Sequence, residues 1–168
     1  MTPRVALLRA INAGVALPMA DLRRIAVEAG LANPRTYIAS GNLLFDSPIP
    51  DAEARQLLEA GLAAHTGKPI WLTLRTGAEL AALTAANPFP DHPGNRVFVT
   101  FLHADPPPDA LAQARHRSDE QLALGPRAII VHYPTGLGHS RLVIPALKAG
   151  TARNMNTVAK LAELARGS

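Results

Sequence analysis

Residues 4–47 read RVALLRAINAGVALPMADLRRIAVEAGLANPRTYIASGNLLFDS, and this stretch decides the fold. It opens with an apolar run of strand length at 4–9 and continues with apolar residues at helical spacing over 18–30. Two further strand-like runs, 35–39 and 43–46, are separated by a short Ser-Gly-Asn linker. The order predicts a strand, a helix and a hairpin.

The chain downstream extends this pattern. Apolar residues on one side of 51–66 predict a second helix, which Gly67 ends, and alternation over 69–75 predicts a fourth strand. The order βαββαβ is that of a ferredoxin-like module, in which the first strand lies beside the third in a four-stranded antiparallel sheet. We therefore predict such a module over residues 1–75.

The second half repeats the opening in pattern rather than in identity. Arg4 and Arg96 begin the leading strands, Arg35 and Arg127 begin the next ones, and both pairs are 92 residues apart. This spacing predicts an α+β fold of two ferredoxin-like modules with mainly antiparallel sheets. The predicted parts after the first module are a helix and connection over 76–95 and a second module over 96–168, with strands at 96–102, 127–133 and 141–144 and helices at 106–117 and 154–165.

The composition limits the classes of function. The 168 residues contain no Cys, which excludes disulfides, thiolate metal sites and cysteine nucleophiles. The first apolar run is too short for a signal peptide or a membrane span, so we expect a cytoplasmic protein without a membrane partner. Five basic residues and one acidic residue lie in 140–168, which indicates either an anionic partner or a solvated helix face.

The main candidate site lies where two loops meet. Because the first two strands run parallel, the first loop and the hairpin turn should lie at one edge of the sheet, near the start of the first helix. Guanidinium, carboxamide and hydroxyl groups, together with free helix N–H groups, suit a phosphate or carboxylate. Alternatively, the two asparagines satisfy turn backbone and Arg9 pairs with Asp46. The predicted anion-binding residues are Arg9, Asn12, Gly14, Ser40, Gly41 and Asn42.

A weaker anion site is predicted at the start of the last helix, from Arg153, Asn154 and Lys160. Asn154 or Thr151 acting as a simple N-cap explains the same residues. Of the six scattered histidines, only His132 and His139 are expected to meet, and they lack a third ligand, so no metal site and no cofactor is predicted. No catalytic residues stand out.

Five strings resemble a known family. The family pattern matches nearly the whole chain. This sequence departs from that pattern at Ala10, where glycine is usual, at Val15, where glycine is common, and at Met155, where an aromatic residue is usual. The resemblance, to the bacterial domain of unknown function 1697 family, implies a two-part α+β fold and brings no activity. The strings are LLRAINAG at 7–14, TYIASGN at 36–42, NPF at 87–89, SRL at 140–142 and TARNMNT at 151–157.

Three functions remain open at this stage. The first is a binding module for an anionic ligand, either a phosphate-bearing molecule or nucleic acid. The second is an enzyme acting on a small phosphorylated or carboxylated metabolite at the Arg9 cluster, which lacks an evident general base. The third is an interaction or scaffold protein without a small ligand.

Overall fold

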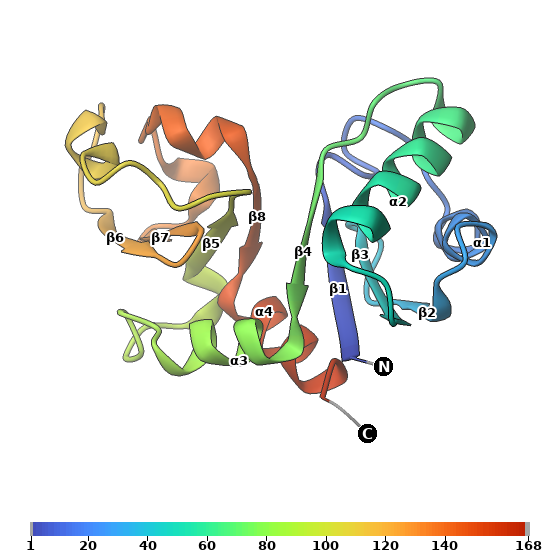
Figure 1. Ribbon diagram of the computed structural model, residues 1–168. Coiled ribbons are helices and arrows are strands. Elements are labelled where there is room, and N and C mark those ends of the chain that lie inside the picture. Colours follow the sequence, from blue (N-terminus) through green and yellow to red (C-terminus); the bar gives the residue numbers. More distant parts are fainter. Residues whose placement is uncertain (1, 167–168) are drawn as a thin grey trace. The chain divides into compact units, whose positions relative to one another are not determined.

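The computed structural model describes residues 2–166 and contains two four-stranded antiparallel sheets (Figure 1). The chain divides into two compact units, residues 2–79 with 161–166 and residues 80–160. The strand orders are β2-β3-β1-β4 and β6-β7-β5-β8, so the two sheets have the same topology. This confirms the predicted α+β class with two ferredoxin-like modules. Within residues 2–166, no helix is both long and apolar enough to cross a membrane.

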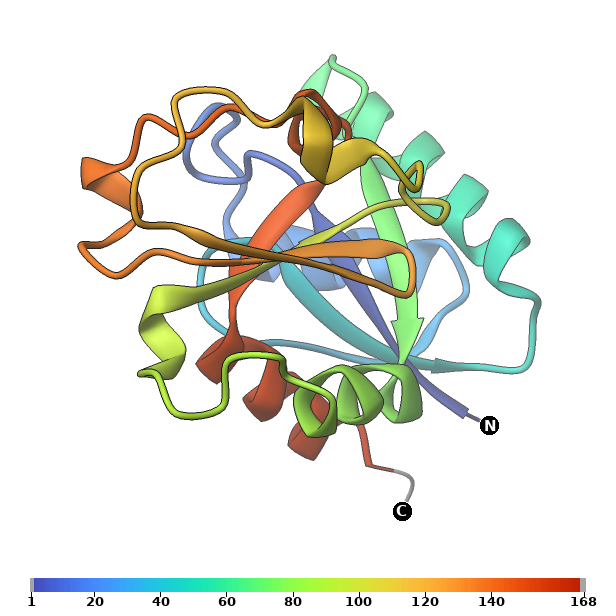
Figure 2. The ribbon, with the colours of Figure 1, turned by 90° about the vertical axis from the view of Figure 1, so that its left-hand side faces the viewer.

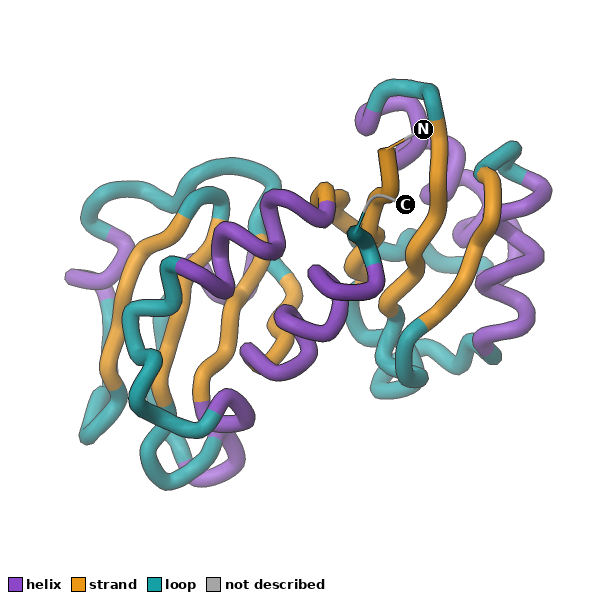
Figure 3. Tube along the Cα trace, turned by 90° about the horizontal axis from the view of Figure 1, so that it is seen from below, coloured by secondary structure: helices purple, strands orange, loops and turns teal. Residues whose placement is uncertain are grey.

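The first unit contains the predicted elements in the predicted order, although the second strand lies at 32–36 and not at the predicted 35–39. Helices α1 and α2 lie along one face of the first sheet (Figures 1 and 3). Their buried leucine and isoleucine side chains form a core with alternate residues of β1, β3 and β4, as the period of two in a strand requires. The elements are β1 (Thr2–Leu8), α1 (Met19–Glu28), β2 (Ala32–Thr36), β3 (Asn42–Ser47), α2 (Asp51–Thr66) and β4 (Leu72–Thr76).

The second unit builds the same sheet with less helix. A third helix, α3 (Gly77–Ala85), begins at a capping box in which Thr76 and Glu79 bond each other's backbone N–H groups. Short 3-10 turns replace the helices that cover the first sheet, and Figure 2 shows the β6–β7 hairpin with these irregular segments in yellow and orange. The remaining elements of the chain are η1 (Gly94–Arg96), β5 (Val97–Phe101), η2 (Ala110–Gln113), β6 (Gln121–Gly125), β7 (Ala128–His132), η3 (Leu137–His139), η4 (Pro145–Ala149), β8 (Thr151–Asn154) and α4 (Met155–Leu164), whose last residues belong to the first unit.

Two predicted elements of this half are wrong. The segment 106–117 forms only the turn η2, because the chain becomes extended at Ala114 and the backbone of Arg115 pairs with Val143. The segment 141–144 makes only that isolated bridge, since the place beside β5 belongs to β8. Strands β6 and β8 were not predicted: β8 is four residues long, and its buried positions carry the polar Thr151 and Arg153.

The two sheets share a local arrangement in the last strand. In each unit a valine of the central strand lies opposite an arginine: Val5 opposite Arg75, and Val99 opposite Arg153. Each arginine donates from Nη1 to the hydroxyl of the threonine two residues earlier, over 2.8 Å and 2.7 Å. Both arginines are buried. The correspondence of the two sheets therefore extends to side-chain hydrogen bonding.

The spacing of 92 residues between arginines does not follow this register. Because Val5 and Val99 occupy equivalent positions, Arg4 corresponds to Phe98 and not to Arg96. Insertions and deletions between strands change the offset along the chain. The two-module prediction is confirmed, whereas the equal spacing used to support it is a coincidence.

Candidate functional site

The loop cluster predicted around Arg9 does bring two distant loops together. The Asn12 side chain donates from Nδ2 to the carbonyl of Ala39 over 2.7 Å. The backbone N–H of Leu8 donates to the carbonyl of Gly41 over 2.9 Å. These bonds join the end of β1 to the β2–β3 turn, where parallel strands were expected to place them.

The two asparagines of this cluster bond loop backbone. Oδ1 of Asn12 accepts from Leu17 N–H at 2.9 Å, and its Nδ2 also donates to the Leu17 carbonyl at 3.0 Å. Asn42 is fully buried and donates to the Tyr37 carbonyl at 3.1 Å and to the Ser40 hydroxyl at 3.3 Å. Both carboxamides therefore stabilise the loop conformations, which agrees with the alternative that the two asparagines satisfy turn backbone.

The other members of the cluster differ in exposure. Arg9 is exposed, and its backbone N–H donates to the Trp71 carbonyl. Asp46 pairs with Arg35 across 3.7 Å. A Cβ on Gly41, whose φ is 90°, would lie 3.1 Å from side-chain atoms of Leu8 and Ile11, so glycine is needed for packing as well as for the backbone.

Both loops contain residues in the left-handed region. Ala10 has φ 61°, Asn12 φ 58° and Ile38 φ 51°. The positive φ of Ala10 explains why glycine suits this position. Ile38 is a β-branched residue, and this conformation costs it about 1–2 kcal/mol. Gly14 is exposed and donates to the Ala10 carbonyl at 2.9 Å.

The predicted tail site is built differently. Arg153 is 7 % exposed and lies on β8, where it bonds the Thr151 hydroxyl and the Ala152 carbonyl. Burial lowers the pKa of Arg153 to about 10, which leaves it charged at neutral pH. Asn154 caps α4 by accepting from Thr157 N–H at 2.9 Å, and Lys160 is half-buried. Arg153 is therefore largely buried and hydrogen-bonded to groups of its own strand.

A pocket forms at one end of the second sheet. Its base is a row across three strands, in which His132 of β7 lies between Val97 of β5 and Gln121 of β6. The backbone bond from Tyr133 N–H to the Arg96 carbonyl extends this pairing by one step. Since Ile129, Val131 and Tyr133 enter the core on one face of β7, His132 points to the opposite face.

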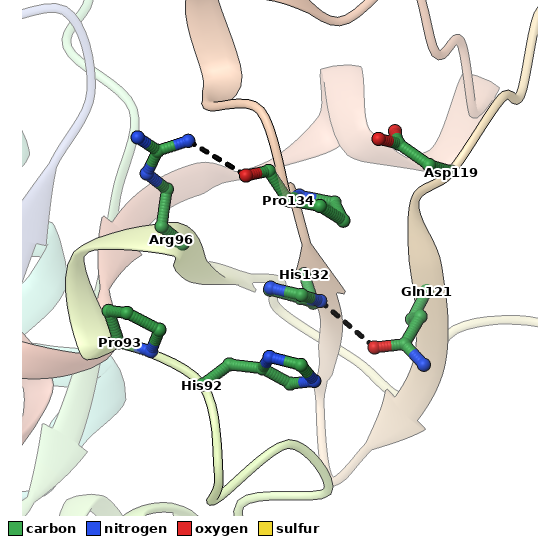
Figure 4. A pocket seen from close by; sticks show the side chains of 7 residues that line it. All are labelled: His92, Pro93, Arg96, Asp119, Gln121, His132 and Pro134. Carbon is green, nitrogen blue, oxygen red and sulfur yellow. Dashed lines mark hydrogen bonds between the residues drawn. The ribbon is translucent and has the colours of Figure 1, made fainter.

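The pocket has a volume of about 540 Å³ (Figure 4). The imidazole of His92 stacks on that of His132, with ring centroids 3.8 Å apart and an interplanar angle of 20°. Phe89 approaches the same histidine with its centroid at 5.9 Å. Two prolines complete the apolar part of the wall. The lining residues are His92, Pro93, Arg96, Asp119, Gln121, His132 and Pro134.

His132 is the buried member of the stack, at 3 % exposure. Its Nδ1 lies 2.9 Å from Oε1 of Gln121, so the ring hydrogen resides on Nδ1 and Nε2 is an acceptor. Burial lowers the pKa of His132, and the neighbouring His92 and Arg96 lower it further, whereas Asp119 opposes the shift. His132 is therefore a neutral imidazole at pH 7.

Two opposite charges lie at different sides of the histidine pair. Figure 4 shows Arg96 on one side and Asp119 and Gln121 on the other. Nη1 of Arg96 donates to the Pro134 carbonyl at 2.9 Å, which fixes the guanidinium at the rim with further N–H donors on its planar fork. The pocket thus has a cationic end and an end that both accepts and donates hydrogen bonds.

The segment that carries Asp119 is held by its neighbour. Glu120 is 3 % exposed and accepts from Ser118 N–H and from the Ser140 hydroxyl, each at 2.6 Å. The Ser140 hydroxyl, followed by the Ser118 N–H, lowers the pKa of Glu120, so the carboxylate stays ionised at neutral pH. The backbone next to Asp119 is therefore held in place on this side of the pocket.

The sequence prediction missed this pocket. His132 meets His92, and not the predicted His139, because η1 places residues 92–96 beside the end of β7. The polar residues at the starts of β5 and β6 indicate the pocket only when the strand register is known, because the register decides which of them lie beside His132. Within the described part of the chain, no three His, Asp or Glu side chains are placed to hold a metal ion.

Topology and pocket together define a protein of two ferredoxin-like modules whose second module carries a histidine-lined cavity. The chain belongs to the DUF1697 family, proteins of unknown function, whose sequence profile matches residues 1–129. This confirms the resemblance over residues 1–129, whereas the strings at 140–142 and 151–157 lie outside the matched residues. The fold is similar to that of conserved bacterial protein SP0830 from Streptococcus pneumoniae, with 24 % identity, 99 % coverage of each chain and a TM-score of 0.83. The comparison with curated proteins finds no match.

Proposed function

We propose that the protein is a binding module for a small phosphate-bearing ligand and that the His92–His132 pocket holds it. The observation that carries this proposal is the Arg96 guanidinium at the rim of a cavity floored by a neutral, buried histidine. Arginine presents a planar fork that matches the oxygens of a phosphate. The volume of about 540 Å³ is within the range of small-molecule sites.

Binding suits the histidine pair better than acid–base catalysis. A general acid and a general base for phosphoryl chemistry must reach opposite sides of the reacting group. The rings of His92 and His132 are stacked at 3.8 Å, so no ligand atom fits between them. The pair therefore serves as one surface of a binding site.

Arg9 offers a second proposed location for an anion. Its guanidinium is exposed, but the carboxamides expected to assist it are bonded to loop carbonyls. An anion there would depend on a single solvated arginine, which gives little affinity. We therefore place the ligand in the pocket and use Arg9 as a control.

Isothermal titration calorimetry with ribose 5-phosphate and inorganic pyrophosphate tests this proposal. Arg96→Gln removes the charge but keeps a polar side chain, and it should weaken binding about tenfold or more, the loss of one charge-assisted contact. Arg9→Ala should leave binding unchanged. Binding that Arg9→Ala abolishes and Arg96→Gln spares would move the site to the loops. No binding of either probe below about 10 mM would overturn the proposal.

A further inference from the structure

His132 brings an unpaired ring nitrogen to the pocket. Its side chain is 3 % exposed, and Nδ1 is bonded to Oε1 of Gln121. Within residues 2–166, Nε2 makes no hydrogen bond, although the ring lines the pocket. A buried acceptor without a partner is unfavourable, because it has given up its hydrogen bond to water. Nε2 is therefore the atom of the pocket floor that a ligand is expected to contact.

Nε2 faces the same side of the pocket as the guanidinium of Arg96. Figure 4 shows Nδ1 directed toward Gln121 and the other ring nitrogen directed toward the side of Arg96. Burial is the largest cause of the lowered pKa of His132, and the charges of His92 and Arg96 add to it, so Arg96 lies within electrostatic reach of the ring. A phosphate bound at Arg96 would therefore present an oxygen to Nε2.

Such a contact needs a hydrogen that neither partner supplies above pH 7. Neutral His132 has only an electron pair at Nε2, because its hydrogen resides on Nδ1. A phosphate monoester loses its last proton with a pKa of about 6, so its oxygens are then acceptors as well. Two acceptors repel each other unless a proton from the solvent lies between them. Phosphate and imidazole are suited to share one, because their ordinary pKa values are close.

We infer that the pocket binds a phosphate monoester together with one proton, which is held between a phosphate oxygen and Nε2 of His132. This inference rests on the proposed function, which places a phosphate-bearing ligand in this pocket. The charged or titratable groups that face the ring are His92 from the segment before η1, Arg96 of η1 and Asp119 from the segment before β6. The two negative charges of the phosphate outweigh the charge of Arg96, and Asp119 acts in the same direction, so binding favours protonation.

The shared proton selects a terminal phosphate. A phosphodiester has one negative charge and takes up no proton near neutral pH, so it cannot fill the space between Arg96 and Nε2 with the same hydrogen bond. The phosphates of a nucleic-acid backbone are diesters of this kind. The pocket should therefore prefer a small phosphate monoester to nucleic acid.

Calorimetry in two buffers of different ionisation enthalpy counts the protons. At about pH 7.5, wild-type protein should take up about one proton per ribose 5-phosphate bound, and Kd should rise about tenfold for each further pH unit. The methyl ester of this phosphate, a diester with the same sugar, should bind at least about tenfold more weakly.

Variants and a spectroscopic readout identify the group that holds the proton. His132→Asn removes the titrating ring and should abolish the uptake, whereas His92→Phe keeps a flat ring in the stack and should retain it. His139→Ala, which changes an exposed histidine outside the pocket, is the matched control and should behave like wild type. In the wild-type protein, ribose 5-phosphate should move the nitrogen NMR signal of Nε2 toward that of a protonated ring nitrogen, a readout that needs no variant to fold.

The outcomes separate this inference from the proposed function. If ribose 5-phosphate binds and Arg96→Gln weakens it, but no proton is taken up or the methyl ester binds equally well, the inference fails and the phosphate site stands. If the uptake persists in His132→Asn or disappears in His92→Phe, the assignment to His132 is wrong. If ribose 5-phosphate does not bind, both the inference and the proposed function fail.

Discussion

Replacing Asn12 by alanine should destabilise the first unit by about 3 kcal/mol, the sum of lost hydrogen bonds and backbone strain. The change removes two half-buried bonds to Leu17 and one exposed bond to the Ala39 carbonyl. Each half-buried bond is worth about 1 kcal/mol, and the exposed one less, because water replaces it. Alanine at φ 58° adds about 1 kcal/mol, since asparagine adopts the left-handed conformation more readily.

Urea unfolding measures this loss. Trp71 is the only tryptophan and lies in the first unit, so its fluorescence reports the unfolding of that unit. Asn12→Gly removes the same bonds without the strain and should lose about 2 kcal/mol. A midpoint for Asn12→Ala within about 0.5 kcal/mol of wild type, at an unchanged slope, would refute the argument that Asn12 holds the two loops.

Three further predictions follow from single residues. Ile38→Asn should raise the free energy of unfolding by about 0.5–1 kcal/mol in urea, because it relieves β-branched strain at φ 51° and the isoleucine is 52 % exposed. The lowered pKa of Glu120 should contribute stability above its ordinary value of 4.5 that is lost as the pH falls through the folded pKa, so acid unfolding followed by circular dichroism should be less steep in Glu120→Gln. His132 should titrate below 6.5 in an NMR pH series, and its protonation should destabilise the fold as the pH falls below that value; a midpoint at or above 6.5 contradicts its neutral, buried state.

The first module could be predicted from sequence because its elements carry strong local signals. Helix α2 has one apolar face, and Gly67 ends it in the left-handed conformation. The second module lacks such signals. Its strand β8 buries the polar Thr151 and Arg153, so these residues were interpreted as the segment leading into a helix. The segment 106–117, which includes the prolines before η2, was predicted to be a helix and forms only that short turn. Short, polar or irregular elements are specified by their neighbours in the sheet and not by their own periodicity.

The candidate site shows the same division. The meeting of the Asn12 loop and the β2–β3 turn follows from topology alone and was predicted. The hydrogen-bond partners of their side chains were not predicted, because an asparagine in a turn bonds either backbone groups or a ligand, and only the geometry distinguishes the two. The pair of His92 and His132 depends on the register of β5 with β7 and on the short turn η1, which no local pattern encodes.

The common topology of the two sheets locates what distinguishes them. The position of His132 in the row across β5, β7 and β6 is held in the first sheet by Asp46, which lies between Pro3 and Ala32. Asp46 accepts a hydrogen bond from Asn33 on one oxygen and pairs with Arg35 across 3.7 Å on the other, so both of its partners lie within its own sheet. At the equivalent position His132 bonds only through Nδ1 to Gln121 and turns a second nitrogen and a stacked ring toward a cavity. Identical strand order thus yields a closed ion pair in one module and an open pocket in the other, which is why the proposed activity belongs to these side chains and not to the ferredoxin-like fold.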